Sequence, residues 1–505
     1  MVLAAKVLAL LFYLLAEAVS LGLPSQQTTL SPSPLSSARG DGWYVAEQDD
    51  QLCEAGSRHF AGKINVTDGR NIFFWFIESR ESPNDHPVVI WLNGGPGASS
   101  MPGLFTEVGP CVVNSYSNGT VFHEDSWTNH ANILFIDQPA GVGFSEVKDD
   151  DALPGSLADA LPDFLETLNV FYGDIFPQFI SNPLYIAGES YGGQYVPFYT
   201  AAIVEAQHEN TARALQNVSI DGVILVDAGV SFGYNALGHY ELFCTDESKD
   251  LRFNETTCEA MGAATVECEK LTNLCESLYD PHICKAAAEY CSENLERYFQ
   301  EEVEAHRRSP YDLRRDCPVP PICGVGDYDE YGSTPDFLNL ESVQKSLGFD
   351  HPIFYRGINF DLNTKWDSDD NIYLPTTKHL SYLLNGGSDD VSNLPPNSPI
   401  PILVMTGEYD VGINVPGSLL LYDHLPWHGQ ASFRSVRELK PWYWTNQDGM
   451  KREGGLLKAT PAHKGLEFIT INGAGHMAPG DQRGPVSFIV GEWLRNSGTL
   501  VSRHE

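Results

Sequence analysis

Ser190 lies at the centre of a Gly-x-Ser-x-Gly pattern at residues 188–192. The apolar run at 184–187 predicts a short buried strand before it, and residues 194–204 can form a helix after it, with Pro197 near the helix start. A sharp turn from a strand into a helix exposes a serine hydroxyl, and glycines flank the serine because side chains there would collide with neighbouring elements. The pattern therefore predicts a nucleophilic serine.

A serine hydroxyl becomes a good nucleophile only when an imidazole accepts its proton and a carboxylate orients and stabilises that imidazole. Two later patterns supply these groups, in the chain order Ser, Asp, His that a nucleophile on a strand-to-helix turn requires. An apolar run at 402–405 leads to Asp410, and residues 466–471 lead through a Gly-rich loop to His476. The sequence therefore predicts Ser190, Asp410 and His476 as a catalytic triad.

The elements that would position these residues have an α/β pattern. Several apolar runs are continuous rather than alternating, which is typical of strands buried on both faces of a mostly parallel sheet. Apolar residues at helical spacing between 157 and 171 follow Ser156, a predicted N-cap. We therefore expect a mostly parallel central sheet with helices on both faces, and its strands at 72–77, 88–92, 133–136, 184–187, 223–226, 402–405 and 468–471.

The two ends of the chain and its cysteines indicate the domain organisation. Lys6, an apolar run at 7–15 and small residues after it predict a signal peptide over residues 1–20, because the run is too short to span a bilayer. Residues 21–41 are polar and Pro-rich, so we expect a disordered leader or a propeptide remnant, followed by a catalytic domain over 42–498. Eight of the ten cysteines lie between 244 and 323, which predicts a disulfide-stapled cap insertion at about 235–330. Their spacing contains no Cys-x-x-Cys pair and argues against a metal site.

Charge and cysteine content limit the partners and the compartment. The formal net charge of -36 excludes nucleic acid and anionic membranes as partners, because their phosphates would be repelled. Ten cysteines behind a signal peptide predict disulfides and a secreted protein, with a vacuole or another acidic compartment as the alternative. The Asn-x-Ser/Thr sequons predict glycosylation at Asn65, Asn118, Asn217 and Asn254.

Four longer motifs carry a family resemblance. They are Gly-Glu-Ser-Tyr-Gly-Gly-Gln-Tyr-Val-Pro from residue 188, Trp-Leu-Asn-Gly-Gly-Pro-Gly from 91, Ile-Asp-Gln-Pro-Ala-Gly-Val-Gly-Phe-Ser from 136 and Gly-Ala-Gly-His-Met-Ala-Pro from 473. Together they resemble the serine carboxypeptidases, an α/β-hydrolase family, and the similarity extends over about residues 42–495. The resemblance implies a serine-type carboxypeptidase that releases C-terminal amino acids from peptides and proteins at acidic pH through an acyl-enzyme. It implies no cofactor and no metal.

The resemblance also implies roles for the matching residues. The backbone N–H groups of Gly95 and Tyr191 would form the oxyanion hole. Met477 would line the substrate pocket. Two adjacent carboxyl groups cannot both ionise, so a glutamate pair can retain a proton for a hydrogen bond to an arriving carboxylate. The positions that match the family's binding site for the terminal carboxylate of the substrate are Trp91, Asn93, Gly94, Glu107 and Glu189.

The cysteine pattern resembles that of the family's cap. The resemblance implies the bridges Cys244–Cys258, Cys268–Cys291, Cys275–Cys284 and Cys317–Cys323, and it leaves Cys53 and Cys111 as the fifth pair.

Two positions depart from the family pattern. Val226-Asp227-Ala228-Gly229 stands where the family commonly has an Asn-Gly turn, so we expect the path into the cap to differ. Ile413 stands where some relatives have a cysteine, so thiol reagents should not inhibit through that position.

Two other functions stay open. The glutamate pair disfavours an acyltransferase on the same scaffold, and the intact triad disfavours a non-catalytic binding protein.

Overall fold

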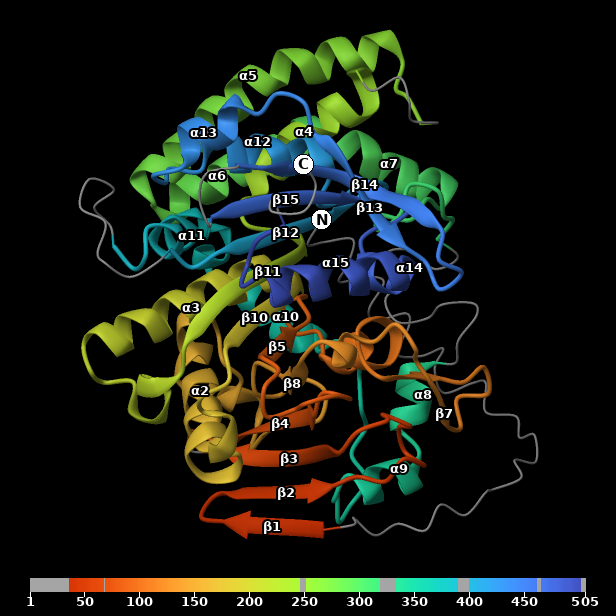
Figure 1. Cartoon of the computed structure of the whole chain (residues 1–505). Helices are drawn as coiled ribbons and strands as arrows, with labels where there is room; N and C mark the ends of the chain where they lie inside the picture. Colours follow the sequence, from red (N-terminus) through yellow and green to blue (C-terminus); the bar gives the residue numbers. More distant parts are fainter. Residues whose placement is uncertain are drawn as a thin grey trace. The chain divides into compact units, whose positions relative to one another are not determined.

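The computed structural model describes residues 36–67, 69–245, 251–317, 333–388, 399–460 and 465–500, and in them a 13-stranded sheet carries the fold (Figure 1). Its centre is parallel and consists, in spatial order, of β8 (Asn132–Asp137), β5 (Val88–Leu92), β10 (Leu184–Ser190), β11 (Ile220–Ala228), β12 (Ile402–Gly407) and β15 (Leu466–Ile471). Antiparallel strands extend both edges: β4 (Arg70–Ile77), β3 (His59–Asn65), β2 (Trp43–Glu47) and β1 (Ser36–Gly40) beyond β8, with β9 (Glu146–Val147) on β4, and β14 (Lys451–Ala459) and β13 (Lys440–Thr445) beyond β15. The predicted α/β class is confirmed, and the centre of the sheet is parallel as predicted, while its edges are antiparallel.

The structure tests only part of the predictions for the N-terminal segment. The predicted signal peptide and residues 21–35 of the predicted leader lie outside the described residues. Residues 36–40 of that leader form β1, whose side chains are exposed and whose backbone pairs with β2. A disordered leader that extends to residue 41 is therefore wrong for this segment, because backbone hydrogen bonds to a neighbouring strand need no apolar side chains.

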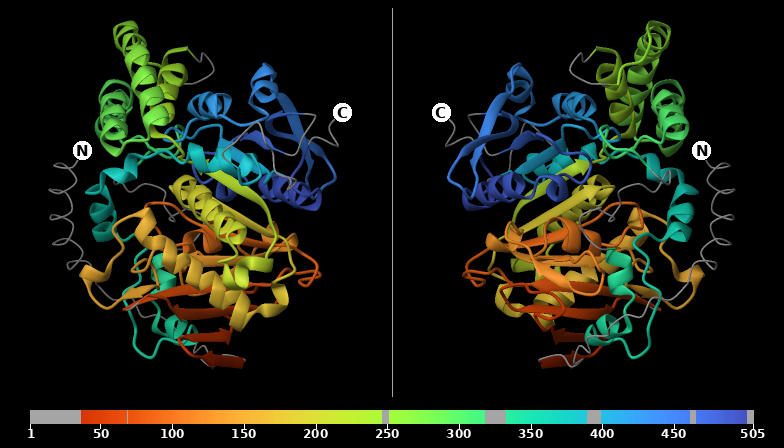
Figure 2. Two further views of the ribbon diagram at one scale, coloured as in Figure 1. Left: turned by 90° about the vertical axis from the view of Figure 1, so that its left-hand side faces the viewer. Right: turned by 90° about the vertical axis from the view of Figure 1, so that its right-hand side faces the viewer.

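The central strands are apolar throughout because two separate cores lie against the sheet. On one face, Ile90 and Leu92 of β5 pack in a cluster with α2 (Leu157–Val170) and α3 (Gly192–His208). On the other face, Val89 and Trp91 of the same strand pack in a cluster with α15 (Arg483–Arg495). Figure 2 shows helices on both sides of the strands. A strand covered on both faces has no position for an exposed side chain, so its sequence does not alternate.

Helix α3, which follows Ser190, contains Pro197. A proline cannot donate the backbone N–H that would bond the carbonyl four residues earlier, here the carbonyl of Gly193. The buried Thr376 hydroxyl supplies a donor instead, because Thr376 Oγ1 donates to the Gly193 carbonyl oxygen at 2.5 Å. Helix α3 is thereby joined to α11 (Thr377–Leu384), which begins at the residue after Thr376.

Between β11 and β12 the chain forms helices, shown from green to cyan in Figure 1. Few large apolar side chains of α5 (Glu255–Leu278) are buried, and disulfides join it to its neighbours. The structure contains Cys268–Cys291 and Cys275–Cys284 between α5 and α6 (Pro281–Cys291), Cys244–Cys258 before them, and Cys53–Cys111 elsewhere in the chain. Cys317 is disulfide-bonded, and Cys323 lies outside the described residues. The remaining helices of this region are α4 (Phe232–Tyr240), α7 (Arg297–His306), α8 (Thr334–Leu338), α9 (Glu341–Ser346) and α10 (Phe360–Asp367).

No helix among the described residues combines the length and the apolar character that crossing a membrane requires.

The contact between Thr376 and α3 predicts a difference between two threonines. We expect Thr376→Val to lower the free energy of unfolding by about 1–2 kcal/mol, because the Gly193 carbonyl loses the donor that replaces the missing proline N–H. Thr200→Val is the matched control: Thr200 Oγ1 donates to the Val196 carbonyl at 2.6 Å, but that carbonyl keeps its helical bond, so the loss should stay below about 0.5 kcal/mol. Chemical denaturation with the disulfides intact measures both. Equal losses would contradict this account.

Candidate active site

Ser190 occupies a sharp turn between β10, which it ends, and α3, which begins at Gly192. The φ angle of Ser190 is 59°, in the left-handed region that residues with side chains rarely adopt. A Cβ atom on Gly188 would lie 2.6 Å from Val196 Cγ2, and one on Gly192 would lie 3.3 Å from the Leu92 carbonyl oxygen. The two flanking positions therefore need glycine for the steric reason inferred from the sequence.

His476 and Asp410 lie in contact. Asp410 follows β12 and His476 follows β15, and these strands are parallel neighbours in register. His476 Nδ1 is 2.8 Å from Asp410 Oδ2, and the exposed fractions of the two side chains are 7% and 0%. The bond to Asp410 leaves His476 Nε2 as the nitrogen that can exchange a proton with a substrate or a nucleophile.

The environment makes His476 more basic than an ordinary histidine. Burial by itself lowers the pKa of His476, but the charge and hydrogen bond of Asp410, together with the nearby carboxyl groups of Glu107 and Asp481, outweigh burial. The net result is a raised pKa. The His476 ring can therefore accept a proton and hold it as an imidazolium beside Asp410.

The Gly-rich loop after β5 packs directly on the serine turn. A Cβ atom on Gly94 would lie 2.8 Å from Ser190 Cβ and closer still to the backbone nitrogen of Tyr191. Gly95 has a φ of 104°, and a Cβ there would lie 2.6 Å from the Gly97 nitrogen. Among the described residues, no acceptor is bonded to the backbone N–H of Gly95 or of Tyr191. Two free N–H groups beside a nucleophile can donate to an oxygen that gains negative charge.

Asn93 joins Glu107 and Glu189 on the other side of the serine turn. Asn93 Oδ1 accepts from Trp91 Nε1 at 2.8 Å and from the Gly103 N–H at 3.2 Å, which orients the amide group. Its Nδ2 then donates to Glu189 Oε2 at 2.9 Å and to Glu107 Oε1 at 3.4 Å. One hydrogen-bond network thus joins four of the five predicted carboxylate-binding residues: Trp91, Asn93, Glu107 and Glu189. Gly94, the fifth, follows Asn93 and packs on the serine turn instead.

The two glutamates form a buried carboxyl pair, each with an exposed fraction of 2%. Burial raises the pKa of Glu189 well above its usual range, and the Glu107 carboxyl beside it raises this pKa further. Burial also raises the pKa of Glu107. Because two carboxylates in contact in a dry site repel each other, the pair retains a proton that a single exposed glutamate would lose.

Met477, which the family resemblance predicts to line the substrate pocket, is buried next to His476 and accepts a hydrogen bond through its carbonyl from the Asp481 N–H at 2.9 Å. Met477 precedes α14 (Ala478–Asp481).

Three further residues at this site were not assigned a role from the sequence. The Tyr311 carbonyl accepts from the His476 backbone N–H at 2.7 Å, and the two rings are 5.3 Å apart. Asp481 Oδ2 accepts from the Gly475 N–H at 2.8 Å. Nothing in the local sequence distinguishes either residue, because both act through contacts with distant segments. Asp227, which the sequence marks only as a departure from the family pattern, lies at the same edge of the sheet.

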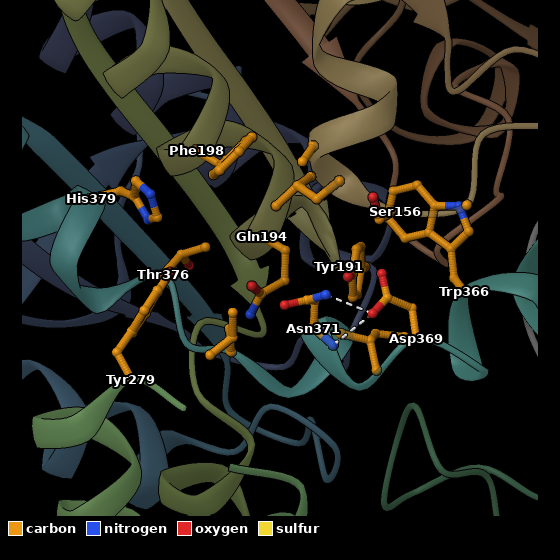
Figure 3. Close-up of a pocket in the computed structure, with 15 residues that line it drawn as sticks. Ser156, Tyr191, Gln194, Phe198, Tyr279, Trp366, Asp369, Asn371, Thr376 and His379 are labelled. Atoms are coloured by element: carbon orange, nitrogen blue, oxygen red, sulfur yellow. Dashed lines mark hydrogen bonds between the residues drawn. The ribbon is translucent and has the colours of Figure 1, made fainter. Parts of the chain in front are cut away.

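A cavity of about 200 Å³ lies beside Tyr191 (Figure 3). Trp366 and Phe198 are apolar lining residues, and Asp369, which also lines the cavity, accepts hydrogen bonds from Asn371. The cavity can hold a side chain with an apolar stem. Among the described residues, no group of three His, Cys, Asp or Glu side chains is arranged to hold a metal ion.

Comparisons with known proteins agree with this geometry. Residues 50–496 match the family model described as serine carboxypeptidase. The chain is 29% identical over 454 residues to carboxypeptidase Y homolog A of Penicillium rubens, covering 87% of this chain and 74% of that protein. It is 30% identical over 456 residues to carboxypeptidase Y of Schizosaccharomyces pombe, covering 87% of this chain and 41% of that protein. The crystal structure of a prohormone-processing carboxypeptidase from Saccharomyces cerevisiae shares the fold, with a TM-score of 0.73, 23% identity, and coverage of 91% of this chain and 97% of that one.

The packing of Gly94 on the serine turn predicts a loss of turnover in Gly94→Ala. The added methyl group would displace the loop or the turn and move the two free N–H groups apart, so we expect kcat to fall by about 100-fold or more. Gly357→Ala is the control, because a Cβ there has no neighbour within 4 Å. Both variants are compared in steady-state kinetics and by thermal melting. A folded Gly94→Ala protein with normal kcat would contradict the assignment of this loop.

Proposed function

The chain belongs to the serine carboxypeptidase family, and on that premise we propose that Ser190 is the nucleophile, His476 the general base and Asp410 the carboxylate that orients it. As a member of this family the protein is a serine-type hydrolase that releases amino acids from the C-terminus of peptides. The observation that carries the assignment is the 2.8 Å contact between His476 Nδ1 and Asp410 Oδ2, at the sheet edge where the strained Ser190 turn also lies.

The proposed reaction begins with acylation. Ser190 Oγ attacks the carbonyl carbon of the last peptide bond while its proton passes to His476 Nε2. The oxygen of the tetrahedral intermediate accepts hydrogen bonds from the N–H groups of Gly95 and Tyr191. His476 then gives the proton to the departing amine, the C–N bond breaks, and the C-terminal amino acid leaves. The rest of the peptide remains as an ester on Ser190.

Deacylation repeats the same steps with water. His476 accepts a proton from a water molecule as the water oxygen attacks the ester carbon, and the same two N–H groups stabilise the oxyanion. The proton returns to Ser190 Oγ as the C–O bond breaks, which releases the shortened peptide and restores the free serine.

We propose that the Glu107–Glu189 pair binds the free C-terminal carboxylate of the substrate. At acidic pH the pair holds a proton and can donate a hydrogen bond to the terminal carboxylate, and Asn93 holds both side chains in place. Glu189 directly precedes Ser190, so a terminus bound there places the last peptide bond near the nucleophile. This arrangement gives a physical reason for exopeptidase activity and for a preference for acidic solution.

We also propose a secretory route, to the outside of the cell or to a vacuole. Disulfides form and persist in oxidising compartments. The sequon residues are all exposed, as glycosylation requires: Asn65, Asn118, Asn217 and Asn254.

The triad assignment predicts the effect of removing the nucleophile. We expect Ser190→Ala to lower kcat by roughly 10⁴–10⁶-fold and to abolish labelling by a fluorophosphonate, with the melting temperature retained. His476→Ala should cost a similar factor, because the two side chains act as a unit. Ser435→Ala, at an exposed serine on α13 (Gln430–Ser435), is the matched control and should leave kcat unchanged. Normal turnover in folded Ser190→Ala would exclude the assignment.

The glutamate pair predicts a pH dependence that depends on the substrate terminus. As pH rises through the upper ionisation step of the pair, both carboxyls become negative and repel the incoming carboxylate, so KM should climb while kcat changes less. An esterified terminus carries no charge, so its KM should depend far less on pH. Glutamine at positions 107 and 189 donates without titrating and should flatten the rise for free peptides.

The measurement is KM against pH for one peptide with its terminus free and esterified. Parallel curves would mean that the pair does not bind the terminus.

A further inference from the structure

Asp227 is a buried acid at the catalytic edge that the proposed mechanism does not use. It lies in β11, between the strand that ends at Ser190 and the strand that leads to Asp410. The side chain is fully buried, with an exposed fraction of 0%, and its φ angle of 42° is in the left-handed region. Backbone strain and the burial of a carboxyl group both cost free energy, so interactions of this side chain must offset that cost.

The hydrogen bonds of Asp227 leave one oxygen for a proton. Its Oδ1 accepts from the Gly407 N–H at 2.7 Å, and Gly407 ends β12 just before the segment that carries Asp410. Its Oδ2 is buried and has no donor among the described residues. The carboxyl group of Asp410 interacts with Asp227 from the segment after β12, where the Asp410 N–H donates to the Gly407 carbonyl at 3.2 Å. Two acceptor-only carboxylates cannot bond each other, so a bond between these groups requires a proton on one of them.

Asp410 already has a partner on each carboxyl oxygen. It accepts from the Ile413 N–H through Oδ1 at 3.2 Å, and its Oδ2 lies 2.8 Å from His476 Nδ1. Among the residues that the structure describes, Asp227 accepts from one donor, the Gly407 N–H, and its other oxygen has none. The proton therefore belongs on Asp227.

The charges around Asp227 also favour its protonated form. Asp410 faces it from the segment after β12, Asp481 from α14 and Glu189 from β10. Burial raises the pKa of Asp227 well above its usual range, and the neighbouring charge of Asp410 raises it further. The groups that face His476 are Asp410, Glu107, Asp481 and the ring of Tyr311.

We propose that Asp227 retains its proton and donates it in a hydrogen bond to Asp410, so that Asp227 is a positioning residue that acts on His476 through Asp410. The inference rests on the triad proposed above. A donor to Asp410 draws charge away from the oxygen that faces His476, which weakens the hold on the imidazolium. His476 then stays neutral, and able to accept a proton, at a lower pH than it would beside an Asp410 without this donor.

The kinetic test is the acid limb of kcat/KM against pH with an esterified substrate, which keeps the Glu107–Glu189 pair from binding a terminal carboxylate. In Asp227→Ala the donor is lost, and the limb should move up by about one pH unit, as expected for a hydrogen bond to a charged group. In Asp227→Asn the amide nitrogen can donate to Asp410 while the amide oxygen accepts from Gly407, so the limb should stay in place. A merely structural role would lower kcat/KM at every pH without moving the limb.

Infrared spectroscopy tests the proton directly and does not depend on catalysis. At about pH 8, Asp227→Asn should lose one carbonyl stretching band of a protonated carboxylic acid relative to the unmodified protein. Asp137→Asn is the matched control. Asp137 is also buried at a strand end, but burial raises its pKa only to about 6, so at about pH 8 it is a carboxylate. The spectrum of Asp137→Asn should therefore keep every carboxylic-acid band of the unmodified protein.

An unchanged band in Asp227→Asn, an unmoved limb in Asp227→Ala, or equal shifts in both variants would each overturn the proposal. If Asp227→Ala does not fold, the infrared result on Asp227→Asn decides. Failure of the triad itself is recognised separately by normal turnover in Ser190→Ala.

Discussion

Parallel strands in register end at a common edge of a sheet, and the catalytic chemistry of this protein depends on that constraint. Strands β5, β10, β11, β12 and β15 are neighbours there. They carry Asn93, Ser190, Asp227, Asp410 and His476 at or just beyond their ends, from segments up to 383 residues apart in the chain. Helices cover both faces, so the edge is dry where these side chains meet. The proposed nucleophile Ser190, the proposed base His476 and several acids therefore share one water-poor space.

Dryness changes what carboxyl groups can do. Glu107 with Glu189, and Asp227 with Asp410, are buried carboxyl pairs in which a proton replaces a counter-ion. In our proposals the first pair binds the substrate terminus and the second sets the basicity of His476.

The elements predicted from the sequence are those whose local pattern reflects burial. The continuous apolar runs predicted the central strands, and Ser156 does cap α2, since its side chain accepts from the Asp159 N–H. Strands β13 and β14 escaped prediction because they extend the sheet edge and most of their side chains are exposed or half-buried. Strand β1 was not predicted because its pairing depends on backbone groups alone. Burial on one side or none leaves too weak a signal in composition.

The sequence by itself determined the order of the catalytic groups, the glycines around Ser190 and the family motifs, because these depend on local turns and on short segments at strand ends. Only the tertiary structure decided which side chains touch. Asn93 is oriented by Trp91 and Gly103, and the His476 N–H is held by Tyr311 from a distant segment. Asp227 was marked in the sequence only as an unusual turn residue. Its contact with Asp410 follows from the position of β11 beside β12, a neighbour relation that no local pattern encodes.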